Sequence, residues 1–205
     1  MVNELELEKD FRFKSDFEMK IGKTGKFEAG LQIRMELGDN NYQVSEFDEN
    51  VSDWLGSDSL SSDLVFSRNI YSLYSTYENM YKKIGYKVGL RAEATDRTTS
   101  TSAGAGQEIM RFDLFPSVHF SRKLKADQQV MLSYSRRVDR PGGWELSPFP
   151  SYINSTFIRS GNPNLLPEFI SNFDLSYQKR INRSFISVEG YYRTAVNKIT
   201  RINTV

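Results

Sequence analysis

Cysteine is missing from the 205 residues, which excludes disulfides, thiolate metal sites and cysteine nucleophiles. Long apolar runs are missing too, because no stretch approaches the roughly 20 apolar residues that a membrane-spanning helix needs. Neither sign of charge predominates, since 27 Lys and Arg residues stand against 26 Asp and Glu residues. Such a balance gives no global field that would attract nucleic acid. A disulfide-rich domain, a helical membrane protein and a basic nucleic-acid-binding protein are therefore all disfavoured.

Catalytic and metal-binding patterns are scarce as well. The single histidine, His119, belongs to no Ser–His–Asp pattern, and we interpret it as a solvated side chain rather than a base or ligand. The glycine-rich stretch 103–106 lacks the Lys-Ser/Thr pair of a phosphate loop. The acidic stretches 39–41 and 48–50 lack the spaced oxygen ligands of a calcium site. We therefore expect no enzyme, no cofactor and no metal site.

What the sequence does contain is alternation of apolar and polar residues in runs of about ten. In residues 26–37 the apolar side chains take every second position: Phe27, Ala29, Leu31, Ile33, Met35 and Leu37. Successive side chains of a strand point to opposite faces, so this stretch would have one apolar and one charged face. A wall with lipid outside and water inside requires this pattern, and its average is polar, as the mean hydropathy of −0.53 is here.

Eight stretches carry the alternation, and the connections between them differ in length. The predicted strands are residues 7–21, 26–37, 65–81, 86–95, 109–122, 128–138, 169–179 and 184–194. Short turns follow the first, third, fifth and seventh strands, whereas the connections 38–64, 96–108 and 139–168 are long. Outer-membrane barrels combine short periplasmic turns with long extracellular loops in this way. The sequence thus predicts an all-β fold, an antiparallel up-and-down meander of about eight long strands that is part of a transmembrane β-barrel.

A soluble β-sandwich is the alternative that the pattern leaves open. Its strands also alternate, and turns recur at comparable intervals. Sandwich strands usually have about 5–6 residues, whereas a strand that crosses a bilayer needs about 9–11. The predicted strands have the greater length, which favours the membrane barrel.

Aromatic residues at the strand ends fit the same interpretation. Tyr and Trp side chains settle at the headgroup level of a membrane and form girdles at its two interfaces. We expect Tyr81 and Tyr86, which flank a short turn, in the periplasmic girdle. Tyr134, Trp144 and Phe149 would mark or overhang the outer girdle.

Three motifs between residues 132 and 177 carry a more specific resemblance. Residues 133–141 read Ser-Tyr-Ser-Arg-Arg-Val-Asp-Arg-Pro, residues 144–149 read Trp-Glu-Leu-Ser-Pro-Phe, and residues 161–168 read Gly-Asn-Pro-Asn-Leu-Leu-Pro-Glu. They resemble the barrel of TonB-dependent outer-membrane receptors, especially the large barrel family common in Bacteroidota. The motif residues are Arg137, Pro141, Pro148, Phe149, Gly161, Asn162, Pro163, Leu165, Pro167 and Glu168. Residues 69–93 resemble a hairpin of the same family.

The third motif also has a physical explanation that does not depend on the family. Pro163 and Pro167 fix φ and remove backbone donors, and Gly161 is expected to adopt a conformation closed to other residues. Asn162 precedes a proline and so favours a turn. We expect a stiff segment at the barrel rim that directs the next strand. The role assigned to these residues is structural, and the ligand-binding residues stay unassigned.

The resemblance implies a location in the outer membrane of a Gram-negative bacterium and a part in ligand uptake. Such receptors close about 22 strands around a plug, whereas this sequence shows eight strands, no plug and no signal peptide. Residues 1–205 are therefore expected to form a partial barrel domain. Its partners would be outer-membrane lipid, an unknown imported ligand and, only through the missing plug, the TonB complex. A small complete barrel or a soluble β-protein that binds a ligand or partner through its long loops remains the alternative.

A partial barrel has a direct structural consequence. Strands that curve for a wide cylinder should form an open or loosely curved sheet, with strand order following the sequence. Pairing between residues 7–21 and 184–194 would instead indicate a closed eight-stranded barrel.

Overall fold

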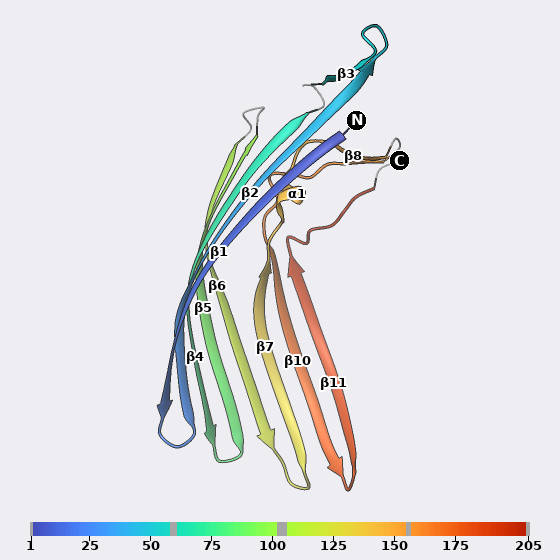
Figure 1. The fold of residues 1–205 in the computed structure, drawn as a ribbon. Coiled ribbons are helices and arrows are strands. Elements are labelled where there is room, and N and C mark those ends of the chain that lie inside the picture. The colour runs from blue at the N-terminus through green and yellow to red at the C-terminus, as the bar shows by residue number, and fades with distance from the viewer. Residues whose placement is uncertain (1, 58–60, 102–105, 155–156, 204–205) are drawn as a thin grey trace.

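The structure is a computed structural model that describes residues 2–57, 61–101, 106–154 and 157–203. Nearly all regular structure is strand (Figure 1). The strands are β1 (Val2–Ile21), β2 (Gly25–Asp48), β3 (Asp53–Gly56), β4 (Ser62–Tyr81), β5 (Ile84–Thr101), β6 (Gln107–Lys123), β7 (Gln128–Asp139), β8 (Ser151–Asn154), β9 (Phe157–Arg159), β10 (Glu168–Ile181) and β11 (Ser184–Val196). A short helix, α1 (Gly143–Leu146), follows β7. Within these ranges, no helix has the length and apolar character to cross a membrane.

One antiparallel sheet organises the chain. Its order is β1-β2-β4-β5-β6-β7-β10-β11, β3 pairs with the upper part of β2, and β8 and β9 form a separate hairpin. The predicted meander of eight long strands is therefore confirmed. The sheet is curved but open (Figure 1), and among the described residues β1 pairs only with β2 and β11 only with β10. The closed eight-stranded alternative is thus not the arrangement observed.

Short turns join the strands at one end of the sheet, as predicted. Lys82 and Lys83 connect β4 to β5, and Asn182 and Arg183 connect β10 to β11. The first residue of each of these turns has a positive φ, 55° at Lys82 and 53° at Asn182. Two-residue hairpins favour such a backbone because its twist matches that of the strands.

The strands extend well beyond their predicted outer ends. β2 runs for 24 residues to Asp48, and its ladder with β4 continues to the pair Tyr42↔Ser62. The predicted loop 38–64 therefore contains the end of β2, the β2–β3 hairpin and the start of β4, although 58–60 lie outside the described residues. The predicted loop 96–108 likewise contains the ends of β5 and β6, and 102–105 lie outside the described residues. Backbone pairing continues here after the apolar alternation has ended.

The two faces of the sheet differ as the alternation predicts. On one face, called the outer face here, large apolar side chains are exposed: Leu73 66%, Leu90 48% and Phe112 70%. The other, inner face carries polar residues that the chain itself covers, including Ser72 at 6%, Glu93 at 4% and Arg97 at 4% exposure. In β5 the outer positions become polar from Asp96 onward. The apolar band of this strand therefore ends near Ala94.

The sheet divides between β6 and β7 at its upper end. The β6–β7 ladder ends at Ser117↔Ser135, although β6 stays paired with β5 as far as Gln107. The next residue, Pro116, has no backbone N–H to donate to a neighbouring strand. Above this point the buried ring of Phe169 in β10 stacks on that of Phe115 in β6, with centroids 6.3 Å apart. The upper ends of β7 and β10 therefore pack against the sheet instead of continuing it.

Candidate functional site

The connection from β7 to β10 folds over the inner face of the sheet. This segment, residues 140–167, is called the signature loop because it holds most of the sequence motifs. Figure 1 shows α1 and the β8–β9 hairpin at the upper end of the sheet. The fully buried Leu146 of α1 and the buried, inward-facing Leu64, Phe66 and Ile70 of β4 contribute to a small core at this end. The loop is thus part of the folded interior rather than a projection from the rim.

Arginine side chains of the wall hold the signature loop through its backbone carbonyls. Arg68 Nη1 of β4 donates to the oxygen of Pro141 at 3.0 Å. Arg97 of β5 donates from Nη1 to the oxygen of Leu165 at 3.0 Å and from Nη2 to that of Pro163 at 3.1 Å. These contacts fix both ends of the loop on neighbouring strands.

A buried ion pair adds a third attachment. Arg140, at the start of the signature loop, pairs with Glu93 on the inner face of β5 and also donates to Thr95 Oγ1 at 3.4 Å. Glu93 pairs with Arg91 as well, and Arg91 Nη2 donates to Ser72 Oγ at 2.9 Å. Removing one partner of a buried charged pair leaves the other uncompensated, so such pairs fix geometry strongly.

Within the signature loop, two stretches of chain pack closely against each other. The N–H of Gly161 donates to the oxygen of Ser147 at 2.6 Å, and the N–H of Asn162 donates to that of Glu145 at 2.7 Å. A Cβ on Gly161 would lie 2.8 Å from the oxygen of Ser147 and would also meet the backbone of Glu145. Gly161 has no positive φ, so the expected special conformation was wrong. Close approach of two backbones is the reason for glycine here.

The remaining motif residues lie around this packed centre. Pro141, Pro167 and Glu168 are buried, Pro148, Phe149, Pro163 and Leu165 are half-buried, and Arg137 and Asn162 are exposed. Glu168, the first residue of β10, accepts a bond from the N–H of Ile199 at 3.1 Å. Asn162 Oδ1 accepts from the N–H of Asn164 at 2.9 Å, which forms the expected turn. The structural role of the ten residues remains a prediction, and the structure shows where they lie.

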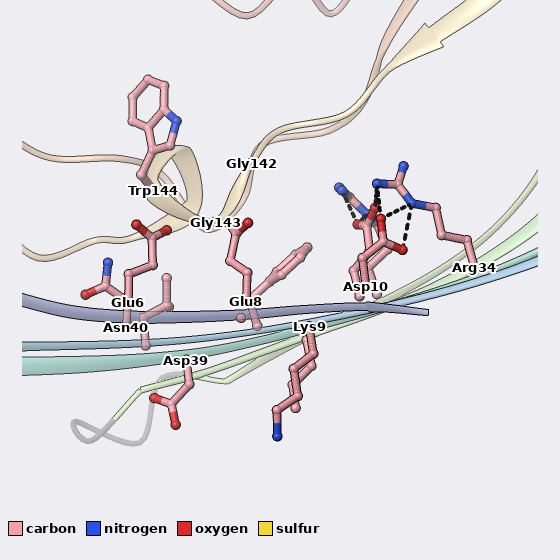
Figure 2. A pocket seen from close by; sticks show the side chains of 16 residues that line it. Glu6, Glu8, Lys9, Asp10, Arg34, Asp39, Asn40, Gly142, Gly143 and Trp144 are labelled. Atoms are coloured by element: carbon pink, nitrogen blue, oxygen red, sulfur yellow. Dashed lines mark hydrogen bonds and ion pairs between the residues drawn. The ribbon is translucent and has the colours of Figure 1, made fainter. Parts of the chain in front are cut away.

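An open cavity of about 220 Å³ separates the signature loop from the first two strands (Figure 2). Glu6 and Glu8 of β1 point from the sheet toward Gly143 and Trp144 of α1, whereas Lys9 and Asp39 point to the opposite side (Figure 2). Trp144, which was expected to mark or overhang the outer aromatic girdle, lies in α1 at the upper end of the sheet, and its place relative to the girdle stays a prediction. Trp144 lines the cavity from α1, but its ring points away from Glu6 and Glu8 (Figure 2), and the guanidinium carbons of Arg159 and Arg201 lie 3.7 and 4.8 Å from the ring centroid.

The charged floor of this cavity is partly neutralised. Arg34 pairs with Asp10 at 3.0 Å and with Glu36 at 2.6 Å, and Glu36 also pairs with Arg68. Among the ion pairs of the described residues, none includes Glu6 or Glu8. The cavity thus offers the carboxylates of Glu6 and Glu8, which are in none of these ion pairs, on the wall formed by β1. In the described ranges, no group of three or more His, Cys, Asp or Glu side chains is arranged to hold a metal ion.

Comparison with known proteins identifies the family. Residues 2–205 match the family described as outer membrane protein beta-barrel family. The chain belongs to this family. Its location is therefore the outer membrane, where the apolar outer face of the sheet contacts lipid. No curated protein matches the chain.

Solved structures of outer-membrane receptors share the fold. The copper transporter OprC matches with a TM-score of 0.68 and 14% identity over 92% of this chain and 30% of its own. The ferric yersiniabactin uptake receptor FyuA from Yersinia pestis matches with a TM-score of 0.60 and 12% identity, over 95% of this chain and 29% of its own. The ferric citrate transporter FecA in its unliganded form matches with a TM-score of 0.54 and 11% identity, over 87% of this chain and 26% of its own. The chain thus spans about 30% of the length of the first of these barrels, and the resemblance to TonB-dependent receptors is confirmed at the level of the fold.

Sequence reasoning missed the arginines that anchor the signature loop in this family member. Arg68 and Arg97 stand directly opposite each other in the β4–β5 ladder, on the inner face. Like charges in opposite positions are unfavourable unless other partners stabilise them. Once the register of the two strands is known, this pair of arginines indicates that both side chains have partners elsewhere. The carbonyl partners, more than 60 residues away in the sequence, carried no signal.

Proposed function

We propose that this chain forms part of the wall of a receptor that imports a ligand across the outer membrane. The observation that carries the proposal is the inner face, where charged side chains and the signature loop line an open cavity of about 220 Å³. A wall that only separated two compartments would need no charged cavity on its inner face. The carboxylates of Glu6 and Glu8 are the groups that we assign to ligand contact.

The ligand class follows from the family resemblance and stays broad. We propose a scarce compound too large for porins, such as a metal chelate, a cofactor or a glycan. The named neighbours transport copper or take up ferric yersiniabactin or ferric citrate, which supports the first of these classes. The cavity would contact only part of such a ligand, because ligand sites usually measure about 300–1,000 Å³.

Energy and gating would come from outside these residues. We propose that residues 1–205 are a partial barrel domain, that further strands complete the wall, and that a plug inside it communicates with the TonB complex. The coverage of about 30% of the length of OprC supports this division. The soluble alternative is not supported, because the chain belongs to an outer-membrane family.

The test is growth on limiting nutrients. Three strains are compared: one that lacks the gene, the same strain complemented with the gene, and one without the TonB complex. Each is grown on ferric citrate, a ferric siderophore, copper(II), cobalamin or an oligosaccharide. We expect the strain without the gene and the strain without the TonB complex to stop growing on the same nutrient when it is limiting, and to grow when it is in excess. Equal growth of all strains on every nutrient would contradict the proposal.

A matched pair of variants then tests the cavity. Glu8→Gln removes a cavity charge, and Glu18→Gln makes the same change on the same face of β1, beyond the cavity lining, where Glu18 pairs with Lys26 at 3.1 Å. We expect only Glu8→Gln to change the half-saturating ligand concentration for uptake, with the maximal rate unchanged. Identical uptake curves for the two variants would remove the cavity from the ligand path.

A further inference from the structure

Positive charge is concentrated at the end of the sheet where the short hairpin turns lie, called the turn end here, although the net charge of the chain is only +1. The four turns and the residues beside them, 20–26, 82–83, 122–127 and 179–183, contain eleven Lys and Arg residues and one acidic residue. At the opposite end, residues 38–64 contain seven Asp and Glu residues and no Lys or Arg. The balanced composition therefore conceals a separation of charge along the strands.

The four turns follow one edge of the sheet (Figure 1), and hydrogen bonds join each hairpin to the next. Thr24 Oγ1 donates to Asn79 Oδ1 at 2.6 Å, the N–H of Lys123 donates to the oxygen of Lys83 at 3.1 Å, and the N–H of Arg180 donates to the oxygen of Asp127 at 3.1 Å. These bonds hold the basic side chains of neighbouring turns side by side, so that their electrostatic fields add.

Almost none of these cations has a carboxylate partner. Lys26 pairs with Glu18 and Glu28, but the ion pairs of the described residues include none of the other ten. Of these ten, all are exposed except Lys179, which is half-buried. The chain thus leaves the positive charge of the turn end uncompensated, and an external anion would lower its electrostatic energy.

The turn end also borders the outer face of the sheet, which contacts lipid. Tyr81 and Ile84, on either side of the turn Lys82–Lys83, are exposed on this face, and Lys82 Nζ lies 5.3 Å from the centroid of the Tyr81 ring. Arg122 is exposed and stands opposite Ile84 in the β5–β6 ladder, so it lies on the outer face too. Basic side chains placed next to apolar ones at a membrane surface extend to the lipid headgroups.

We propose that the turn end binds the headgroups of anionic phospholipids in the adjacent leaflet of the membrane. Loop length assigns this leaflet to the periplasmic side. An acidic protein below the barrel would meet the same positive charge, but Lys82 and Arg122 lie on the outer face, beside lipid rather than below the lumen. The contact fixes the depth of the wall in the membrane and is independent of the imported ligand.

The lipid preference of the reconstituted receptor tests the proposal. The full-length receptor is placed in phosphatidylcholine vesicles, and electron paramagnetic resonance compares how strongly spin-labelled phosphatidylglycerol and spin-labelled phosphatidylcholine associate with its surface. We expect phosphatidylglycerol to associate about two to five times more strongly, because basic residues near the surface attract anionic lipid. The double variant Lys82→Gln with Arg122→Gln should lower this ratio. The control, Arg193→Gln with Lys198→Gln, removes two exposed cations near the opposite end of β11 and should leave the ratio unchanged.

A second measurement needs no variant. Raising the salt concentration from 0.1 M to 1 M shortens the Debye length from about 10 Å to about 3 Å, so the ratio for the unaltered receptor should fall toward one. Equal association of the two lipids with the unaltered receptor at low salt would overturn the proposal and leave the turn end to an acidic protein partner. A ratio that is as high in the Lys82→Gln, Arg122→Gln variant as in the control would overturn it as well, because the anionic lipid would then bind elsewhere.

Discussion

At the scale of the residue, the space around Gly161 decides whether the signature loop can fold onto itself. A methyl group there would meet backbone atoms of Glu145 and Ser147, which cannot move independently as side chains can. We therefore expect Gly161→Ala to destabilise the loop by about 1–3 kcal/mol. The control is Gly143→Ala, because a Cβ at Gly143 would find no atom within 4 Å. Limited proteolysis of the purified receptor should cut the loop faster in Gly161→Ala than in Gly143→Ala, and equal rates would contradict the packing argument.

The assignment of the two faces also rests on single residues. Leu90 is exposed on the outer face of β5, where lipid surrounds it, whereas His119 lies on the inner face of β6, in the pair Lys87↔His119. An arginine at the bilayer midplane costs about 2–4 kcal/mol, so Leu90→Arg should reduce the folded fraction. His119→Arg adds the same side chain on the aqueous side and should cost much less. Unfolding in lipid vesicles measures both, and equal losses would show that the faces are misassigned.

At the scale of the element, the sequence was informative wherever lipid imposes the alternation. Residues 26–37 and 86–95 were predicted as strands because their outer positions must be apolar. Above the apolar band, the outer positions do not contact lipid and so need not be apolar. The ends of β2 and β5 continue there through backbone pairing without apolar alternation. No side-chain periodicity marks this pairing, so the strand ends were placed too early.

Loop length predicts which end of the strands faces the cell exterior. The turn after β2, at Asn50, should lie outside, and the turn after β1, at Lys23, should lie in the periplasm. Because these 205 residues contain no cysteine, Asn50→Cys and Lys23→Cys each introduce one label site into this part of the receptor, and the unaltered receptor gives the background. A membrane-impermeant maleimide should label Asn50→Cys on intact cells and Lys23→Cys only after the outer membrane is permeabilised. Labelling in the opposite order would invert the orientation.

At the scale of the whole molecule, contacts distant in sequence determine what the sequence could not reveal. Arg68 and Pro141 are 73 residues apart, and Arg97 and Leu165 are 68 apart. Local periodicity carries no information on such pairs. The motifs around Pro141 and Gly161 indicated a stiff segment at the rim, but its position over the inner face required the three-dimensional arrangement. The division of the sheet at Pro116 could not be predicted from the sequence either. A proline within a strand is compatible with an edge strand, a strand start or a bulge.

The free edges of the sheet lead to the last prediction. β1 and β11 each have one neighbour among the described strands, and an unpaired backbone group in hydrocarbon costs several kcal/mol. In the membrane both edges must therefore pair, and we predict that they pair with further strands rather than with each other.

Cysteine pairs in the cysteine-free chain separate these outcomes. Phe11→Cys with Met35→Cys, which are partners in the β1–β2 ladder, should cross-link in the membrane-inserted receptor and serves as the positive control. Phe13→Cys combined in turn with cysteine at Ile186, Val188 or Tyr192 of β11 should give no cross-link within one chain. A link between β1 and β11 as efficient as the control would mean that these strands close a small barrel, and the wide receptor wall proposed for this chain would have to be abandoned.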